Sequence, residues 1–353
     1  MLGQSTVPKK ICILRLSAIG DVCHAVAMVQ YIQRYSPDSE ITWIVGKIEA
    51  QLLKGMPGVR FVVFDKKAGL QGYKDLKQAL NDEQFDVLLH MQVALRASIA
   101  SLMIKAKVKI GFDKARAKEG QWLFTNRRVN AQSEPHVAEG FMAFAQALGL
   151  PEAKPTWHID MLEQDISWAE QAIRGDKPIA ILCPAASKAE RNWHSKGYAQ
   201  VADSLIDRGF TVAICGGPTA LEQKLAADIE EAMQHHAINL IGKTSLKQLH
   251  ALLKRAHMVI APDTGPAHMA VTVGTPVVGL YAHSNPMRTG PYLSQDFVVS
   301  AYQRHIESQQ GKSLAQIPWG TRAKGETLMN DILVEDVLNK VNALIAHHYP
   351  ELI

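Results

Sequence analysis

The chain has 353 residues, 47% hydrophobic and 20% charged, a composition typical of a globular protein with room for two domains. No apolar run approaches the roughly 20 residues of a membrane-spanning helix, and Arg15 interrupts the first apolar stretch, so neither a transmembrane segment nor a signal peptide is expected. The four cysteines are scattered without a Cys-x-x-Cys pair, which favours reduced thiols and a cytoplasmic location.

The net charge of +4 is unevenly distributed. Residues 1–165 contain 21 Lys and Arg against 17 Asp and Glu, whereas residues 166–353 contain 17 of each. Residues 96–128 alone carry nine basic and two acidic side chains. This run is either an ordinary solvated surface or one that attracts a phosphate- or carboxylate-bearing partner or a membrane face. Nucleic acid is not expected, because no nucleic-acid-binding motif accompanies the charge.

Short β-branched strands alternate with helical stretches along the whole chain, which is typical of parallel sheets covered by helices. In the first half we predict strands at 11–16, 41–45, 60–64 and 86–89, and helices at 21–35 and 134–149. In the second half we predict strands at 178–184, 211–217, 239–241, 258–262 and 276–281, and helices at 195–208, 221–234, 245–256 and from 265.

These elements predict an α/β protein with two Rossmann-like, doubly wound domains, residues 1–165 and 166–330, that face each other across a cleft. An amphipathic helix at 331–348 is expected to close the chain within a terminal segment, 331–353. Residues 302–325 are polar and are predicted to be irregular, and their length favours a functional loop over a plain connection.

The loop after the first strand reads SAIGDVCH, residues 17–24. It has one glycine, so the three-glycine dinucleotide fingerprint is missing and a nicotinamide or flavin enzyme is not expected. Asp21 is either a capping or first-turn acid of the next helix, or a general base. His24 lies one turn later and is either a buried structural histidine, or a partner that orients the base or serves as an alternative base.

Two further loops follow strands of the second half. PAASKAERNW, residues 184–193, offers the hydroxyl of Ser187 and the cations Lys188 and Arg191 to a departing diphosphate, although an ordinary basic loop has the same composition. APDTGPAH, residues 261–268, ends a strand and opens a helix whose free backbone N–H groups can bind an anion. There Asp263 or Thr264 can simply cap the helix.

These segments carry a resemblance to a known family. SAIGDVCHAV, PAASKAERNW and PDTGPAHMAVTVGTPVVGLY with the following NPMRTGPY occur in the order found in glycosyltransferase family 9, the ADP-heptose:lipopolysaccharide heptosyltransferases. The resemblance implies a GT-B fold and inverting, metal-independent transfer of heptose. Ala186 stands where the family has a hydroxyl residue, and Arg191 stands where part of the family has a lysine. Both differences affect the contacts that are expected with the donor.

The resemblance also implies roles for individual residues. Asp21 matches the general base, with His24 beside it. The residues expected to bind the donor are Ser187, Lys188, Arg191, Glu222, Asp263, Thr264, Gly265, Pro266 and His268. The residues expected to bind the acceptor, chosen from charge and from the first loop, are Ser17, Gly20, Lys66, Lys67, Arg96, Arg127 and Arg128.

The expected partners are ADP-heptose and the anionic inner core of lipopolysaccharide (the Kdo–lipid A region). The enzyme is expected in the cytoplasm with peripheral contact to the inner membrane. No Asp-x-Asp motif is present and the histidines are not paired at ligand spacing, so no metal and no cofactor is predicted. Addition of the first heptose is slightly favoured over the second. A sugar-nucleotide 2-epimerase and a non-catalytic nucleotide-sugar-binding protein remain as alternatives.

Overall fold

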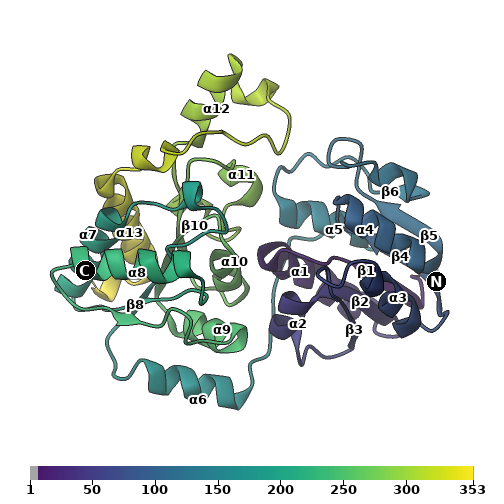
Figure 1. The fold of residues 1–353 in the computed structure, drawn as a ribbon, viewed down its shortest axis with the longest axis horizontal. Coiled ribbons are helices and arrows are strands. Elements are labelled where there is room, and N and C mark those ends of the chain that lie inside the picture. The colour runs from purple at the N-terminus through teal and green to yellow at the C-terminus, as the bar shows by residue number, and fades with distance from the viewer. Residues whose placement is uncertain (1–6, 353) are drawn as a thin grey trace. The chain divides into compact units, whose positions relative to one another are not determined.

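The computed structural model describes residues 7–352 and divides the chain into two compact units, Met1–Asp160 and Met161–Ile353 (Figure 1). The division lies before the predicted boundary at 165/166, because the helix Glu163–Ala172 (α6) packs within the second unit, where Arg255 donates to its carbonyl at Ala169 (2.5 Å). The terminal segment 331–353, which was predicted as a closing helix after the second domain, belongs to the second unit.

The first unit is built on a six-stranded, wholly parallel sheet in the order β3-β2-β1-β4-β5-β6. Its strands are β1 (Lys10–Leu14), β2 (Glu40–Gly46), β3 (Val59–Phe64), β4 (Gln84–His90), β5 (Lys105–Gly111) and β6 (Arg127–Arg128). Successive residues of β1 point to opposite faces of the sheet, and all of them after Lys10 are buried. This is expected for a parallel sheet that helices cover on both sides.

Helices cover both faces of this sheet (Figure 1). They are α1 (Ile19–Tyr35), α2 (Lys47–Leu53), α3 (Leu70–Ala79), α4 (Leu95–Ala100) and α5 (Val137–Ala147), with 3-10 turns η1 (Ser101–Met103) and η2 (Gln121–Leu123). On one face, Leu76 of α3 and Ala97 of α4 join Cys12 and Leu14 in one apolar core. The helices α1 and α5 pack against each other.

The second unit repeats this arrangement, with the parallel order β12-β11-β10-β7-β8-β9. Its strands are β7 (Ile179–Leu182), β8 (Thr211–Ile214), β9 (Ile238–Asn239), β10 (Met258–Pro262), β11 (Val277–Tyr281) and β12 (Val299–Ser300). Both units therefore have the doubly wound Rossmann order, in which the direction of winding reverses beside the first strand.

The helices of the second unit are α6, α7 (Ser195–Asp207), α8 (Ala220–Ala232), α9 (Leu246–Arg255), α10 (Gly265–Thr272), α11 (Pro286–Thr289), α12 (Tyr302–Gln310) and α13 (Val334–His348). Its 3-10 turns are η3 (Ala189–Arg191), η4 (Gln295–Phe297), η5 (Leu314–Gln316), η6 (Leu328–Asp331) and η7 (Pro350–Leu352). The closing helix α13 places Val337, Val341 and Leu344 in the same core as Tyr198 of α7. None of the helices in the described chain combines the length and apolar character needed to cross a bilayer.

Several elements, among them helices α2, α3, α4 and α6, were not predicted, and two further stretches differ from the interpretation that their composition suggested. Residues 302–325 were expected to be irregular, but they begin with α12, whose Tyr302 and Ile306 are one turn apart and both buried. Within the basic run, Lys105–Gly111 forms strand β5 rather than a solvated helix or loop. Its lysines alternate with smaller or apolar residues, which is a strand pattern hidden by charge.

Candidate functional site

In the first unit, the loop after β1 lies at the carboxyl edge of the sheet, where the order switches between β1 and β4. Gln92, just past β4, fixes this loop, because its Oε1 accepts from the backbone N–H groups of Leu16 (2.6 Å) and Ser17 (3.3 Å). Gln121 in turn donates to the carbonyl oxygens of His90 (2.7 Å) and Gln92 (3.3 Å). Ligands of open α/β sheets bind at such a switch point.

Asp21 lies in the first turn of α1. Its carboxylate accepts from the backbone N–H of Ala18 (3.3 Å), which follows a cis peptide bond, and forms an ion pair with Arg15. Arg15 also donates to the carbonyl of Met91 (2.6 Å), and its guanidinium lies 5.2 Å from the centre of the Phe141 ring. Since the Asp21 side chain is 33% exposed, this first-turn acid can also accept a proton from a ligand.

His24 is buried between α1 and α5 rather than presented at the loop. Its ring meets that of His136 edge-on, with centroids 5.2 Å apart, and lies 6.3 Å from the ring of Trp157. Trp157 Nε1 donates to the carbonyl of Cys23 (2.8 Å). These contacts favour the structural interpretation of His24. Gly20, an expected acceptor residue, is buried in the same first turn of α1.

The basic side chains expected to meet the acceptor lie after or beside strands of the first sheet. Lys66 and Lys67 are exposed just beyond β3, and Arg96 is exposed on α4 after β4. Arg127 and Arg128 form the edge strand β6 and are exposed, pairing with the carboxyl end of β5. All five therefore lie toward the carboxyl edge that carries Asp21.

Four of the nine basic side chains at 96–128 are engaged within the first unit. These interactions are Lys105 with Asp82 (2.8 Å), Lys107 with Asp86 (3.4 Å), Arg116 with Asp113 (3.0 Å) and Lys109 Nζ with the carbonyl of Ser101 (2.8 Å). The positive electrostatic potential predicted for residues 96–128 therefore comes from the remaining cations. These are Arg96, Lys114, Lys118, Arg127 and Arg128, which are all exposed.

In the second unit, the switch point between β7 and β10 carries the other two motifs. In the loop after β7, Asn192 Oδ1 accepts from the backbone N–H of Ala186 (2.7 Å), while Ser187 and Lys188 are exposed. Arg191 is partly buried, and burial together with the nearby Arg322 lowers the pKa of its guanidinium. Mutual repulsion of two cations at this edge favours an anionic ligand between them.

The turn after β10 is joined to that loop, because Thr264 Oγ1 donates to the carbonyl of Ala185 (3.1 Å). Thr264 holds the N-cap position of α10, but its side chain makes no capping bond, and Pro266 occupies the first turn as predicted. Asp263 instead faces His268, with Nε2 and Oδ1 3.6 Å apart. Of the two capping alternatives, the structure therefore places Thr264 rather than Asp263 at the N-cap, without a side-chain capping bond. The N–H groups that begin at Gly265 can serve an anion.

Asp263 is an ionised group in a largely buried setting. Burial opposes its ionisation, but His268, a hydrogen bond from Ser284 and the charge of Arg322 outweigh burial and hold the pKa of this carboxyl below its usual value. Beside it lies a cavity of about 10 Å³, roughly the size of one water molecule, also lined by Arg191, His283 and Ser284. His283 Nε2 is buried there without a hydrogen-bond partner among residues 7–352.

Glu222 lies in the first turn of α8, directly after the loop that follows β8. Its Oε1 accepts from the backbone N–H of Gly217 (2.7 Å), and its Oε2 accepts from the hydroxyl of Thr219 (2.6 Å). Thr219 also caps α8. Each carboxylate oxygen has a second lone pair, so the arrangement leaves Glu222 able to accept a ligand hydroxyl while it fixes the turn.

The chain after α12 supplies residues that sequence reasoning did not assign. Tyr302 donates its hydroxyl to the carbonyl of Thr321 (2.8 Å), and the N–H of Ala323 donates to the carbonyl of His283 (3.0 Å). Arg322 lies between these two anchors and acts electrostatically on Asp263 and Arg191. The only signal in the sequence was the length of this polar segment.

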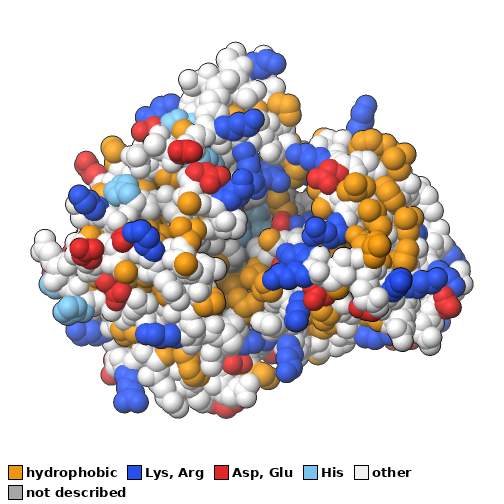
Figure 2. Space-filling model, in the orientation of Figure 1, with side chains coloured by type: hydrophobic (Ala, Val, Ile, Leu, Met, Phe, Trp, Pro, Cys, Tyr) orange, Lys and Arg blue, Asp and Glu red, His pale blue; other side chains and the backbone are white. Residues whose placement is uncertain are grey.

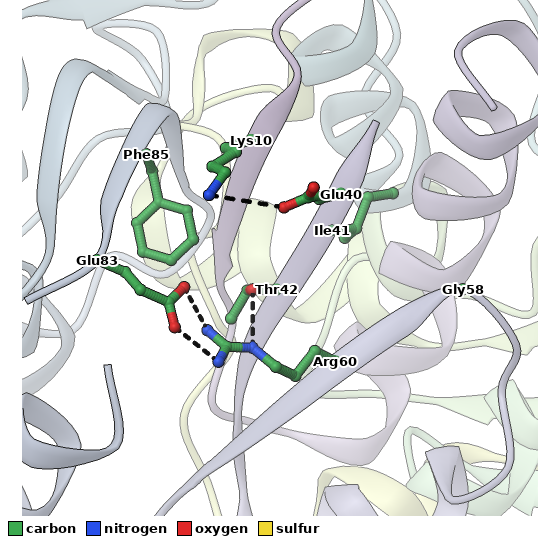
Figure 3. A pocket seen from close by; sticks show the side chains of 8 residues that line it. All are labelled: Lys10, Glu40, Ile41, Thr42, Gly58, Arg60, Glu83 and Phe85. Atoms are coloured by element: carbon green, nitrogen blue, oxygen red, sulfur yellow. Dashed lines mark hydrogen bonds and ion pairs between the residues drawn. The ribbon is translucent and has the colours of Figure 1, made fainter. Parts of the chain in front are cut away.

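A larger hollow, of about 590 Å³, lies at the opposite, amino edge of the first sheet (Figure 3). Its charged groups satisfy one another: Arg60 binds both carboxylate oxygens of Glu83 (2.8 and 2.7 Å) and the hydroxyl of Thr42 (3.3 Å). Lys10 and Glu40 lie 3.8 Å apart. With its charges paired and its place away from the switch point, this hollow is a poor candidate for the site.

No three His, Cys, Asp or Glu side chains within residues 7–352 lie close enough together to hold a metal ion.

Two doubly wound units of this order, each with polar loops at its switch point, have the architecture of the GT-B fold. Two Escherichia coli structures share the fold: ADP-heptose LPS heptosyltransferase II (TM-score 0.70, 22% identity, 96% of this chain and 99% of that one) and heptosyltransferase WaaC with ADP (TM-score 0.72, 19% identity, 95% and 99%).

The sequence matches Glycosyltransferase family 9 (heptosyltransferase) over residues 73–317. It is also 47% identical to the lipopolysaccharide core heptosyltransferase OpsX of Haemophilus influenzae, across 96% of this chain and 97% of that protein. The chain therefore belongs to glycosyltransferase family 9, as the resemblance of its motifs predicted.

Proposed function

We propose that this enzyme transfers heptose from ADP-heptose to the Kdo–lipid A inner core of lipopolysaccharide. Transfer inverts the anomeric carbon, needs no metal, and uses Asp21 as general base. The observation that carries the proposal is the 47% identity, over nearly the full length of both chains, to a lipopolysaccharide core heptosyltransferase. The chemistry of the loops at the two switch points supports it.

In this mechanism Asp21 removes the proton from the acceptor hydroxyl. The hydroxyl oxygen bonds to the anomeric carbon as the bond from that carbon to the diphosphate oxygen breaks, through a transition state with oxocarbenium character. The partial exposure of Asp21 suits contact with a ligand, and its ion pair with Arg15 holds the carboxylate in position. A positioned base of this kind contributes about 10²–10⁴-fold to the rate.

The departing ADP acquires negative charge, which cations and backbone N–H groups stabilise without a metal. Arg191 and Lys188 lie on one loop, and the uncapped helix start at Thr264 and Gly265 lies on the neighbouring one. Arg322 adds a third cation close to Arg191. The donor ribose is assigned to Glu222, whose carboxylate keeps free acceptor capacity.

The acceptor is assigned to the first unit, where exposed basic side chains surround the carboxyl edge that carries Asp21. An acidic sugar on a lipid anchor is an anion at a membrane face, so the proposal places the enzyme in the cytoplasm with peripheral contact to the inner membrane.

The test is product formation from ADP-heptose and a deacylated Kdo–lipid A acceptor, with and without EDTA. We expect a heptosylated acceptor with inverted anomeric configuration, formed at the same rate when EDTA is present. Loss of activity in EDTA that returns with a divalent cation refutes metal independence. Absence of product with this donor and acceptor refutes the proposed substrates.

The same assay separates the alternatives. Conversion of the donor without acceptor indicates a 2-epimerase, and ADP-heptose binding without any turnover indicates a non-catalytic protein. An acceptor that already carries one heptose distinguishes second-heptose from first-heptose transfer, and we favour the first.

A further inference from the structure

The helix α4 and the turn η1 that follows it expose their apolar side. Leu95, Ile99 and Leu102 lie four and three positions apart, on one helical face, and are between 38% and 58% exposed. The opposite face is buried and consists of small residues, including Ala97 and Ser98. An ordinary surface helix has the reverse pattern, with its large apolar side chains turned to the core.

Buried hydrogen bonds hold α4 in this orientation. The hydroxyl of Ser98 lies 3.2 Å from His90 Nε2, and the hydroxyl of Ser101 donates to the carbonyl of Ser98 (2.6 Å). Turning the helix to bury its leucines would break the bond between Ser98 and His90 of β4 and force larger side chains against the sheet. The exposed apolar face is thus a fixed feature of the fold.

The turn η2 extends this apolar surface. Trp122 is 48% and Leu123 78% exposed, while Gln121 beside them is fully buried and hydrogen-bonded. Glu119, just before the turn, accepts from the backbone N–H of Leu95 (2.7 Å) and so joins η2 to the start of α4. We call Leu95, Ile99, Leu102, Trp122 and Leu123 the apolar patch. Figure 2 shows hydrophobic side chains gathered where Figure 1 labels α4 and β6, with Lys and Arg side chains around them.

Positive charges outnumber negative ones around the apolar patch. Of the two acids in residues 96–128, Asp113 is buried with Arg116 (3.0 Å), whereas Glu119 is exposed and accepts from the backbone of α4. Asp82, near Leu102, is paired with Lys105 (2.8 Å). The exposed cations there are Arg96, Lys114, Lys118, Arg127 and Arg128. Apolar and aromatic side chains ringed by cations are typical of surfaces that enter the interface of an anionic bilayer. A second copy of the chain would bring equal positive charge against this surface, which disfavours self-association.

We infer that the apolar patch docks the enzyme on an anionic bilayer, inserting Trp122 and Leu123 between headgroups. The inference rests on the proposed function, because docking on the bilayer would orient the enzyme toward an acceptor that is anchored there by its lipid. Its test needs no acceptor, so it can fail while the transferase proposal stands.

The test is sedimentation of the full chain with sucrose-loaded vesicles of phosphatidylcholine containing about a third phosphatidylglycerol. A Trp122→Ser/Leu123→Ser variant is compared with Leu333→Ser, which removes a side chain of similar exposure (58%) from the second unit. We expect the double variant to bind at least about tenfold more weakly and Leu333→Ser to bind like the wild type. Circular dichroism establishes that both variants are folded.

Transfer to a water-soluble acceptor is expected to be unchanged in the double variant, while transfer to acceptor embedded in vesicles falls. Wild-type protein that does not bind the vesicles, or a double variant that binds them as the wild type does, overturns the inference. A wild-type dimer that becomes monomeric in the double variant also overturns it, because the apolar patch is then an interface between copies.

Discussion

The ion pair between Arg15 and Asp21 allows the structural and catalytic roles of Asp21 to be separated. We predict that Arg15→Met destabilises the first unit yet lowers transfer far less than Asp21→Asn does. Methionine approximates the length of the arginine stem and packs in apolar surroundings, but it removes the charge. The Asp21 carboxylate loses one of the two contacts that position it but keeps the hydrogen bond from the Ala18 backbone N–H and its partial exposure to solvent.

The size of the stability loss follows from the contacts of Arg15. Its side chain is only 10% exposed and donates to the carbonyl of Met91 at 2.6 Å, and a hydrogen bond from a charged donor contributes about 1.5–3 kcal/mol. The ion pair adds less than about 1 kcal/mol because Asp21 is partly exposed. The contact of the guanidinium with the Phe141 ring adds about 1 kcal/mol. Burial of the apolar methionine side chain in the variant offsets a similar amount of the loss. We expect a net loss of about 3 kcal/mol.

For a unit of this size such a loss lowers the melting temperature by about 6–12 °C. Thermal unfolding followed by circular dichroism measures the shift, with Arg34→Met as control, because Arg34 is exposed at the other end of the same helix. Initial rates of heptose transfer are measured below the unfolding transition. A melting temperature unchanged in Arg15→Met, or a rate as low as that of Asp21→Asn, refutes the reasoning.

Three further outcomes are expected. Glu222→Ala removes the acceptor for Gly217 N–H and should weaken ADP binding by about tenfold in calorimetry; unchanged affinity contradicts its assignment to the donor site. Burial lowers the pKa of His90 to about 4 and of His250 to about 3, below the unfolded value near 6.5. Stability should therefore fall as the pH drops below 6.5, by up to about 1.4 kcal/mol per unit for each histidine, and His250→Asn should reduce this slope in urea unfolding at pH 7 and pH 5. The four cysteines are buried, and burial raises the pKa of Cys215 to about 12. The native protein should therefore not react with a thiol reagent until it unfolds. Fast labelling of the native protein would contradict this prediction.

The sequence was most informative where apolar runs were dense. Strand β10 has the predicted bounds, 258–262, because its uninterrupted apolar run is typical of a central parallel strand. Strand β5 was missed because Lys105, Lys107 and Lys109 mask its alternation, and their pairing with residues of neighbouring elements is visible only in three dimensions. Helix α12 was missed because two buried residues in a polar segment give a weak helical signal.

For the site, the motifs located the loops but not their partners. The loops at Asp21, Arg191 and Asp263 follow predicted strands, and parallel topology brings the last two together. Gln92 and Arg322 were not predicted, because each acts on loops distant in sequence, and no local pattern encodes such contacts. The placement of His24 also depends on packing against α5, which its spacing from Asp21 did not indicate.

The most direct test of the account is single-turnover heptose transfer by Asp21→Asn, with saturating ADP-heptose and acceptor. Asparagine keeps the shape of the side chain but cannot take a proton, so we expect the rate to fall by about 10²–10⁴-fold while ADP affinity is unchanged. Transfer by Asp21→Asn at the wild-type rate would show that Asp21 only supports the start of α1 and that the base lies elsewhere.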